Sequence, residues 1–61
     1  MKLQRDDALK VLLQDDNEGV RLAATKSSSA RPEFFDIHAS LLENDSDWEV
    51  RLAAANALNC I

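Results

Sequence analysis

The sequence predicts an all-α fold in which four helices pair as two helix–turn–helix hairpins. Residues 20–24, VRLAA, recur unchanged at 50–54, an offset of 30 within a chain of 61 residues. Apolar residues of the second copy recur at the 3.6-residue spacing of an amphipathic helix. No stretch alternates apolar and polar residues for long enough to form a strand. We therefore expect one domain, 1–61, made of two like units at about 5–30 and about 31–61.

Each unit is expected to begin with an apolar helix. In the first unit Asp6 or Asp7 is placed to cap it. In the second unit Pro32 suits the first position of a helix, because proline has no N–H to leave unpaired there. The Leu–Leu pairs at 12–13 and 41–42 align these two helices with an offset of 29. The apolar residues of the two helices are Ala8, Leu9, Val11, Leu12 and Leu13, and then Phe34, Phe35, Ile37, Ala39, Leu41 and Leu42.

An acidic turn leads into the second helix of each unit. In the first unit this helix starts after Asp16 and fades into the serines 27–29, which we expect to be a frayed end. In the second unit Ser46 is the expected N-cap, with Glu49 completing a capping box. One apolar face of this last helix is formed by Val50, Ala53, Ala54, Ala57, Leu58 and Ile61.

Composition and charge exclude several classes of function. Seven Lys and Arg against eleven Asp and Glu give a net charge of −4, whereas a protein that binds nucleic acid through phosphates needs a basic face. Binding to an anionic membrane surface is disfavoured for the same reason. The single Cys excludes an intramolecular disulfide framework. The apolar runs are too short for a membrane span or a signal peptide, so the cytoplasm is the expected location.

The residues capable of chemistry do not form a recognisable catalytic or metal-binding pattern. His38 is the only histidine, and both metal binding and general-base catalysis need partners at a fixed spacing. We therefore expect it to be a partly buried or surface histidine. Both acidic turns lack the sixth-position Gly and twelfth-position Glu of an EF-hand loop. The expectation is a chain that is not an enzyme, with no catalytic, cofactor-binding or metal site.

The two units resemble HEAT repeats, in particular the short HEAT-like repeats of the phycobilisome-lyase type. The matching residues of the first unit are Leu12-Leu13, Asp16, Val20-Arg21 and Ala23-Ala24, and those of the second are Leu41-Leu42, Asp45, Glu49-Val50-Arg51, Ala53-Ala54 and Ala57-Leu58. The resemblance implies antiparallel helix pairs stacked in a short right-handed α-solenoid. It also implies that Arg21 and Arg51 bridge to turn acids such as Asp16 and Asp45, of the same or the neighbouring repeat.

Two repeats are fewer than such arrays normally need for stability. The C-terminal end is expected to be apolar, and it consists of Ala57, Leu58, Cys60 and Ile61. We therefore expect either that further repeats follow in a longer chain or that another copy covers this end. A stable protein of this length is accordingly expected to dimerise or to stack end to end.

A helical wheel places a second stripe opposite the core face. With Val50 at zero and about 100° per residue, Trp48 and Leu52 lie on the far side of the last helix. In a HEAT-like stack the second helices line the concave face, so this stripe is expected to bind a partner helix or a second copy. The expected partner-binding residues are Leu22, Thr25, Trp48, Leu52, Ala55 and Asn59. The alternative is that Trp48 and Leu52 pack within the domain.

The sequence thus favours a protein-interaction or scaffold module that is not an enzyme. Its partner is a protein, with a second copy of the chain among the candidates, and neither nucleic acid nor a membrane is bound directly. One alternative is a fragment or accessory subunit of a larger HEAT-repeat enzyme, bilin lyase-like or nucleic-acid-modifying. Another is a small inhibitor whose seven turn acids imitate nucleic-acid phosphates: Asp15, Asp16, Glu18, Glu43, Asp45, Asp47 and Glu49.

Overall fold

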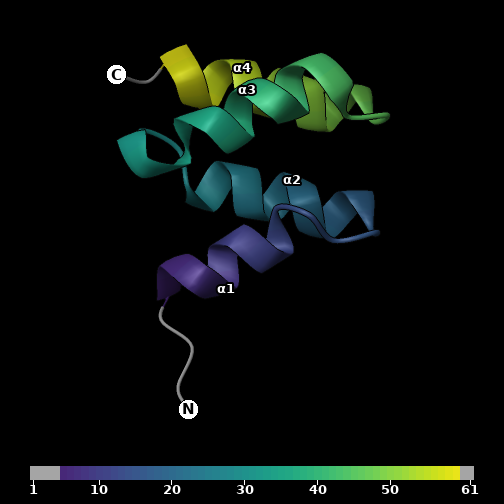
Figure 1. The fold of residues 1–61 in the computed structure, drawn as a ribbon. Helices are drawn as coiled ribbons and strands as arrows, with labels where there is room; N and C mark the ends of the chain where they lie inside the picture. The colour runs from purple at the N-terminus through teal and green to yellow at the C-terminus, as the bar shows by residue number, and fades with distance from the viewer. Residues whose placement is uncertain (1–4, 60–61) are drawn as a thin grey trace.

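Four α-helices and one turn of 3₁₀ helix make up the described part of the chain, residues 5–59, in the computed structural model (Figure 1). The elements are α1 (Arg5–Leu12), α2 (Glu18–Ser27), η1 (Pro32–Phe34), α3 (Phe35–Asn44) and α4 (Trp48–Asn59). No residue between 5 and 59 lies in a strand. The predicted all-α fold of four helices is therefore confirmed.

The helices pair in chain order, α1 with α2 and α3 with α4, and the two pairs meet through α2 and α4. In Figure 1 α2 lies between α1 and the second pair. The expected cap of α1 is wrong, because α1 begins at Arg5 and already contains Asp6 and Asp7. The contact between α2 and α4 brings the two copies of the VRLAA segment onto neighbouring helices.

The second helix of each unit begins at an N-cap that occupies the same place in the repeat. Oδ1 of Asn17 accepts hydrogen bonds from the backbone N–H groups two and three residues on, at 2.8 and 3.2 Å. Oδ1 of Asp47 does the same at 2.8 and 3.4 Å. The prediction of Ser46 as N-cap with Glu49 in a capping box is therefore wrong by one residue. Asp47 also places a carboxylate at the positive end of α4.

The connection between the two pairs is a tight, ordered turn. The serine run was expected to be a frayed helix end, but Ser28 is fully buried and its N–H donates to the carbonyl of Ala24 at 3.0 Å. Ala30 then takes a left-handed conformation with φ 63°. Pro32 begins η1, so it does stand at the first position of a helical segment, which continues directly into α3.

The core runs through both pairs. One cluster contains the buried residues Leu13, Ala24 and Phe34, with Leu9, Ile37 and Leu41 packed against it. The predicted apolar face of α4 is confirmed for Val50, Ala53, Ala54 and Ala57, which are buried. Ala57 therefore does not belong to an exposed C-terminal end, as the sequence suggested. Leu58 is half-buried, and the predictions for Cys60 and Ile61 lie outside the described residues.

Candidate protein-binding groove

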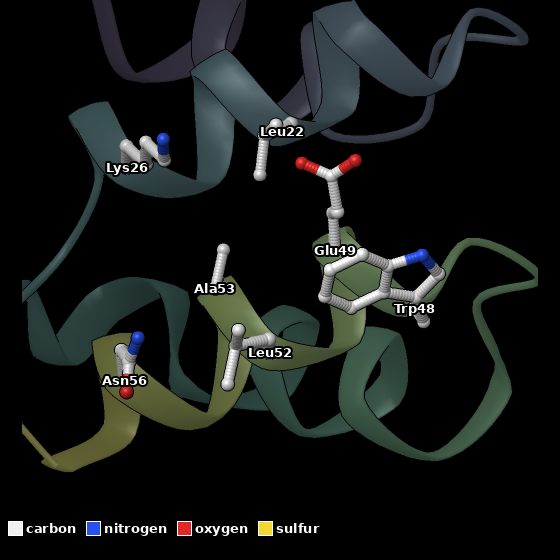
Figure 2. A pocket seen from close by; sticks show the side chains of 7 residues that line it. All are labelled: Leu22, Lys26, Trp48, Glu49, Leu52, Ala53 and Asn56. Atoms are coloured by element: carbon white, nitrogen blue, oxygen red, sulfur yellow. The ribbon is translucent and has the colours of Figure 1, made fainter.

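An open groove of about 220 Å³ runs between α2 and α4. Its walls come from one face of each helix, since the lining positions on α4 are separated by three or four residues. Leu22 of α2 and Ala53 of α4 point toward one another across it (Figure 2). The residues that line the groove are Leu22, Lys26, Trp48, Glu49, Leu52, Ala53 and Asn56.

Two large apolar side chains that line this groove are exposed to solvent. Trp48 is 63% exposed and Leu52 is 54% exposed, whereas Leu22 is half-buried. The small, buried side chain of Ala53 leaves space between them. The polar lining residues are Lys26, Glu49 and Asn56, so the groove combines apolar side chains with polar and charged ones. That combination is typical of small protein-binding sites.

The structure brings together three of the six residues that the helical wheel assigned to this surface. Leu22, Trp48 and Leu52 line the groove, whereas Ala55 is half-buried and Asn59 exposed outside it. The sixth, Thr25, is treated separately below. The wheel orders residues around one helix but does not show which side of that helix meets a neighbour. It therefore missed four lining residues on the sides of α2 and α4 that border the shared space: Lys26, Glu49, Ala53 and Asn56.

The expectation that Thr25 is exposed for partner binding is wrong. Thr25 is fully buried, and its Oγ1 donates a hydrogen bond to the carbonyl of Arg21 at 2.7 Å. Thr25 lies on the same side of the chain as Arg21 and Ser28, which bond to Asp45 and His38 of the second pair, so that side of α2 faces the second pair. A threonine can be buried there at little cost because its hydroxyl is paired within its own helix.

An ion pair fastens α2 to the turn that precedes α4. Nε and Nη2 of Arg21 donate to Oδ2 and Oδ1 of Asp45 at 2.8 and 3.0 Å. Nη1 of Arg21 donates to the backbone oxygens of Asp15 and Asp16, at 2.7 and 3.0 Å. The guanidinium therefore binds the turn of its own unit through backbone and the turn of the next unit through a carboxylate. Such bidentate pairs are directional as well as strong.

The surroundings of Asp45 keep its carboxylate ionised. Burial by itself would raise the pKa of Asp45, since its side chain is only 3% exposed. Hydrogen bonds from Arg21 and from the N–H of Asp47, together with the positive charges of Arg21 and Arg51, outweigh burial and lower that pKa. The same hydrogen bond raises the pKa of Arg21. The carboxylate of Asp45 thus stabilises the fold through its ion pair, and because it is buried it does not contribute to the acidic surface of the turns.

Arg51 repeats part of the arrangement made by Arg21. Its Nη1 donates to the backbone oxygen of Asp45 at 2.6 Å, as Arg21 does to Asp15. Of the four residues that the resemblance assigned to Arg–acid bridges, Arg21 and Asp45 form an ion pair. Arg51 instead binds a backbone oxygen, and Asp16 accepts from Arg21 through its own backbone oxygen.

The expectation of a partly buried or surface His38 is wrong, since the residue is fully buried. Its Nε2 lies 2.9 Å from Oγ of Ser28, which also lies 2.8 Å from the carbonyl oxygen of Ala24. Burial lowers the pKa of His38, so the imidazole is neutral at physiological pH. Its Nδ1 has no hydrogen-bond partner within residues 5–59. Serine and histidine are both buried, and each is the other's hydrogen-bond partner in the core.

The acidic turns use their side chains on their own backbone. Oδ1 of Asp15 accepts from the N–H of Asn17 at 2.9 Å, and Oδ1 of Asp45 accepts from the N–H of Asp47 at 2.9 Å. Within residues 5–59 no three His, Cys, Asp or Glu side chains gather closely enough to hold a metal ion. None of the helices in that range combines the length and the apolarity that crossing a membrane requires.

Comparison with known families supports a HEAT-like repeat in the second unit. The HEAT repeat family model matches residues 39–61. This range covers most of α3, the acidic turn that contains Asp45 and the whole of α4. Neither the curated proteins nor the solved structures include a match to the chain. The described residues, 5–59, thus form a helical fold, and the part similar to a HEAT repeat is the second unit.

Proposed function

We propose that this chain is a protein-interaction module, not an enzyme, and that its groove between α2 and α4 binds an amphipathic helix of a partner protein. The exposure of Trp48 and Leu52 at the groove is the observation that supports this most directly. Tryptophan is over-represented among residues that dominate binding energy, and apolar surface is stabilised by removal from water. HEAT repeats commonly act as protein-interaction scaffolds, which favours the same function.

A helix is the proposed partner segment because of how the groove residues are spaced. Trp48, Leu52 and Asn56 follow one another at intervals of four residues along α4. They span about 12 Å at a rise of about 1.5 Å per residue. A partner helix with apolar side chains at i, i+3 or i+4 and i+7 matches a strip of this length.

The charge of the chain favours a basic partner. The net charge is −4. Glu43 near the end of α3 and Asp47 in the turn that follows both precede Trp48, which lines the groove. Glu49 adds a carboxylate within the groove, against the single ammonium of Lys26. Opposite charges around an apolar contact speed association and select partners. The proposed partner helix therefore carries lysine or arginine beside its apolar stripe.

The proposal includes the finer architecture that the resemblance implies. The two helix pairs are the units of a short right-handed α-solenoid of the phycobilisome-lyase type, and α2 and α4 line its concave face. The ion pair between Arg21 and Asp45 supports this, because it links equivalent parts of successive units. The packing of α2 on α4 supports it as well.

Trp48 provides a direct measurement of binding, because it is the only tryptophan of the chain and lies at the groove. The probe is a synthetic helix-forming peptide of about 15 residues, long enough for helix formation to begin, with leucines on one face and lysines elsewhere. We expect a saturable shift of the Trp48 emission to shorter wavelength. A peptide of the same composition with its leucines scattered around the helix is the comparison. Equal shifts with both peptides would refute the proposed site.

A pair of variants distinguishes binding in the groove from nonspecific binding elsewhere on the surface. Leu52→Asp places a charge in the groove, and Val11→Asp places one on α1 at a side chain that is 63% exposed. We expect Leu52→Asp to weaken peptide binding at least about tenfold, which corresponds to about 1.4 kcal/mol, and Val11→Asp to leave it unchanged. Equal weakening by both contradicts the proposal. A Trp48 shift on concentrating the protein alone, abolished by Leu52→Asp, would instead assign the groove to a second copy.

A further inference from the structure

Equivalent positions of the two units differ in burial. On one surface the residues of the first unit are more buried than their equivalents in the second. Thr25 of α2 is fully buried under the second pair, whereas its equivalent in α4, Ala55, is only half-buried. Leu13, after α1, is fully buried, whereas its equivalent in α3, Leu42, is 39% exposed. Within residues 5–59, these positions are therefore more exposed in the second unit, at the C-terminal end of the stack, than in the first.

The opposite surface shows the reverse difference. Ala53 and Val50 of α4 are buried, and Ala53 faces Leu22 of α2 across the groove. Their equivalents Ala23 and Val20 of α2 are exposed and half-buried, respectively. The N-terminal end of the stack thus presents the other half of the contact. Within residues 5–59, the exposed surfaces at the two ends of the stack are therefore the equivalents of the two surfaces that meet between its units.

The charged groups at the two ends are complementary in the same way. Arg21 binds the carboxylate of Asp45 through Nε and Nη2, but the same two atoms of Arg51 donate no hydrogen bond within residues 5–59. Asp15 is the equivalent of Asp45, and in both residues Oδ1 is held by the N–H two residues on, at 2.9 Å. One end therefore carries a guanidinium with two available donors, and the other carries a carboxylate already held in the matching conformation.

We propose that copies of this chain stack end to end, with Arg51 of one copy forming a bidentate ion pair with Asp15 of the next. Leu42 of one copy would take the place that Leu13 holds against Ile37 and Leu41, and so would pack near their equivalents Ala8 and Leu12 on α1 of the other copy. Ala23 of that other copy would take the place that Ala53 holds beside α2. The contact is head to tail, so each complex still has two free ends and grows beyond a dimer unless it closes into a ring. This goes beyond the proposed function, because it is argued from Arg51, Asp15 and Ala23, none of which lines the groove.

The mass in solution tests the stacking. In sedimentation velocity over a dilution series, we expect species that grow from the 6.8 kDa chain past the dimer as concentration rises. Ala23→Glu adds a charge at the N-terminal end on an exposed side chain, so it should abolish growth without changing the thermal unfolding of the dilute protein. Ser40→Glu is the matched control, since Ser40 and its equivalent Val11 are both exposed. A 6.8 kDa species at every concentration, or equal inhibition by both variants, overturns the proposal.

A charge exchange tests the ion pair itself. Arg51→Glu places a carboxylate opposite Asp15, and Asp15→Arg places a guanidinium opposite Arg51, so each variant alone should remain a monomer. Mixed in equal amounts, the two variants present opposite charges at every contact and should stack again. Circular dichroism of each variant establishes that it is folded. Two folded variants that stay monomeric when mixed overturn the pairing, and so does a mass that stops at the dimer and depends on Leu52 rather than Ala23.

Discussion

The guanidinium of Arg21 binds the carboxylate of Asp45 by two hydrogen bonds, of 2.8 Å from Nε and 3.0 Å from Nη2, although 24 residues separate them. The side chains are 14% and 3% exposed, respectively. Asp45 lies at the end of α3, three residues before α4 begins. The pair therefore joins the second unit to the first at the turn between α3 and α4. Because both side chains are largely buried, each charge is stabilised mainly by the other.

Replacing Asp45 should destabilise the protein far more than replacing a neighbouring surface acid. Asp45→Asn keeps the size of the side chain but leaves the Arg21 charge unpaired. Removing one partner of a buried pair is strongly destabilising, because it leaves the other charge without its partner, so we expect a loss several times that of a surface substitution. Urea unfolding measures the loss. Glu43→Gln, at an exposed position in the same region, should change the free energy of unfolding by less than about 0.5 kcal/mol. Similar losses in both variants would contradict this role for the pair.

The buried imidazole predicts a loss of stability in mild acid. Burial lowers the pKa of His38 in the folded protein, whereas the unfolded chain takes up a proton near pH 6.5. Below that pH the unfolded state binds more protons than the folded state, so the free energy of unfolding falls as the pH falls. The fall continues down to the lowered pKa of the folded protein.

His38→Leu should remove this pH dependence. The equivalent residue of the first unit is Leu9, which packs against the core, and the replacement also removes the unpaired Nδ1. Ser28 keeps its bond to the carbonyl of Ala24. At pH 8 we expect a change within about 1.5 kcal/mol, typical of a swap of similar volume. Thermal unfolding between pH 8 and pH 5 checks both expectations, and an unaltered acid sensitivity in the variant would assign the loss to other groups.

The regular features of this fold could be predicted from sequence, because they depend on local spacing. Helical periodicity identifies four helices and the buried face of α4. The same wheel finds that Trp48 and Leu52 point away from that face, and both are exposed. The N-cap was displaced by one residue, from Asp47 to Ser46, because both residue types cap helices well and helix ends are the least determined positions.

The features that could not be predicted depend on how helices meet. The burial of Thr25 follows from the side of α2 that packs on the second pair, and no property of α2 alone reveals that side. The bond between Ser28 and His38 joins residues ten positions apart, one in the turn after α2 and the other on α3. Each is a polar residue of a type usually found at the surface, and the hydrogen bond between them offsets the loss of water when they are buried. The groove was partly missed for the same reason, since its polar residues border a space that two helices share.

The two N-caps should contribute similar amounts to stability. Asn17→Ala and Asp47→Ala each remove a side-chain acceptor from the start of a helix, which costs about 1 kcal/mol. Asp47→Asn keeps the acceptor and should lose only the interaction of the charge with the helix dipole, about 0.3–1 kcal/mol. Ser46→Ala is the control, because Ser46 is exposed and lies outside α4. A larger loss for Ser46→Ala than for Asp47→Ala would return the cap to Ser46.

Ala30 offers a substitution that should stabilise the protein. Its φ of 63° lies in the left-handed region, which costs a residue with a Cβ about 1–2 kcal/mol. Ala30→Gly removes that cost, while the greater freedom of glycine in the unfolded chain gives back about 0.4–1 kcal/mol. Because Ala30 is exposed, the variant loses little packing, and we expect a net gain of up to about 1 kcal/mol in urea unfolding. Ala23→Gly makes the same chemical change at an exposed position within α2, where it should cost about 1 kcal/mol. Effects of the same sign in the two variants would show that the left-handed turn is not what determines the outcome at position 30.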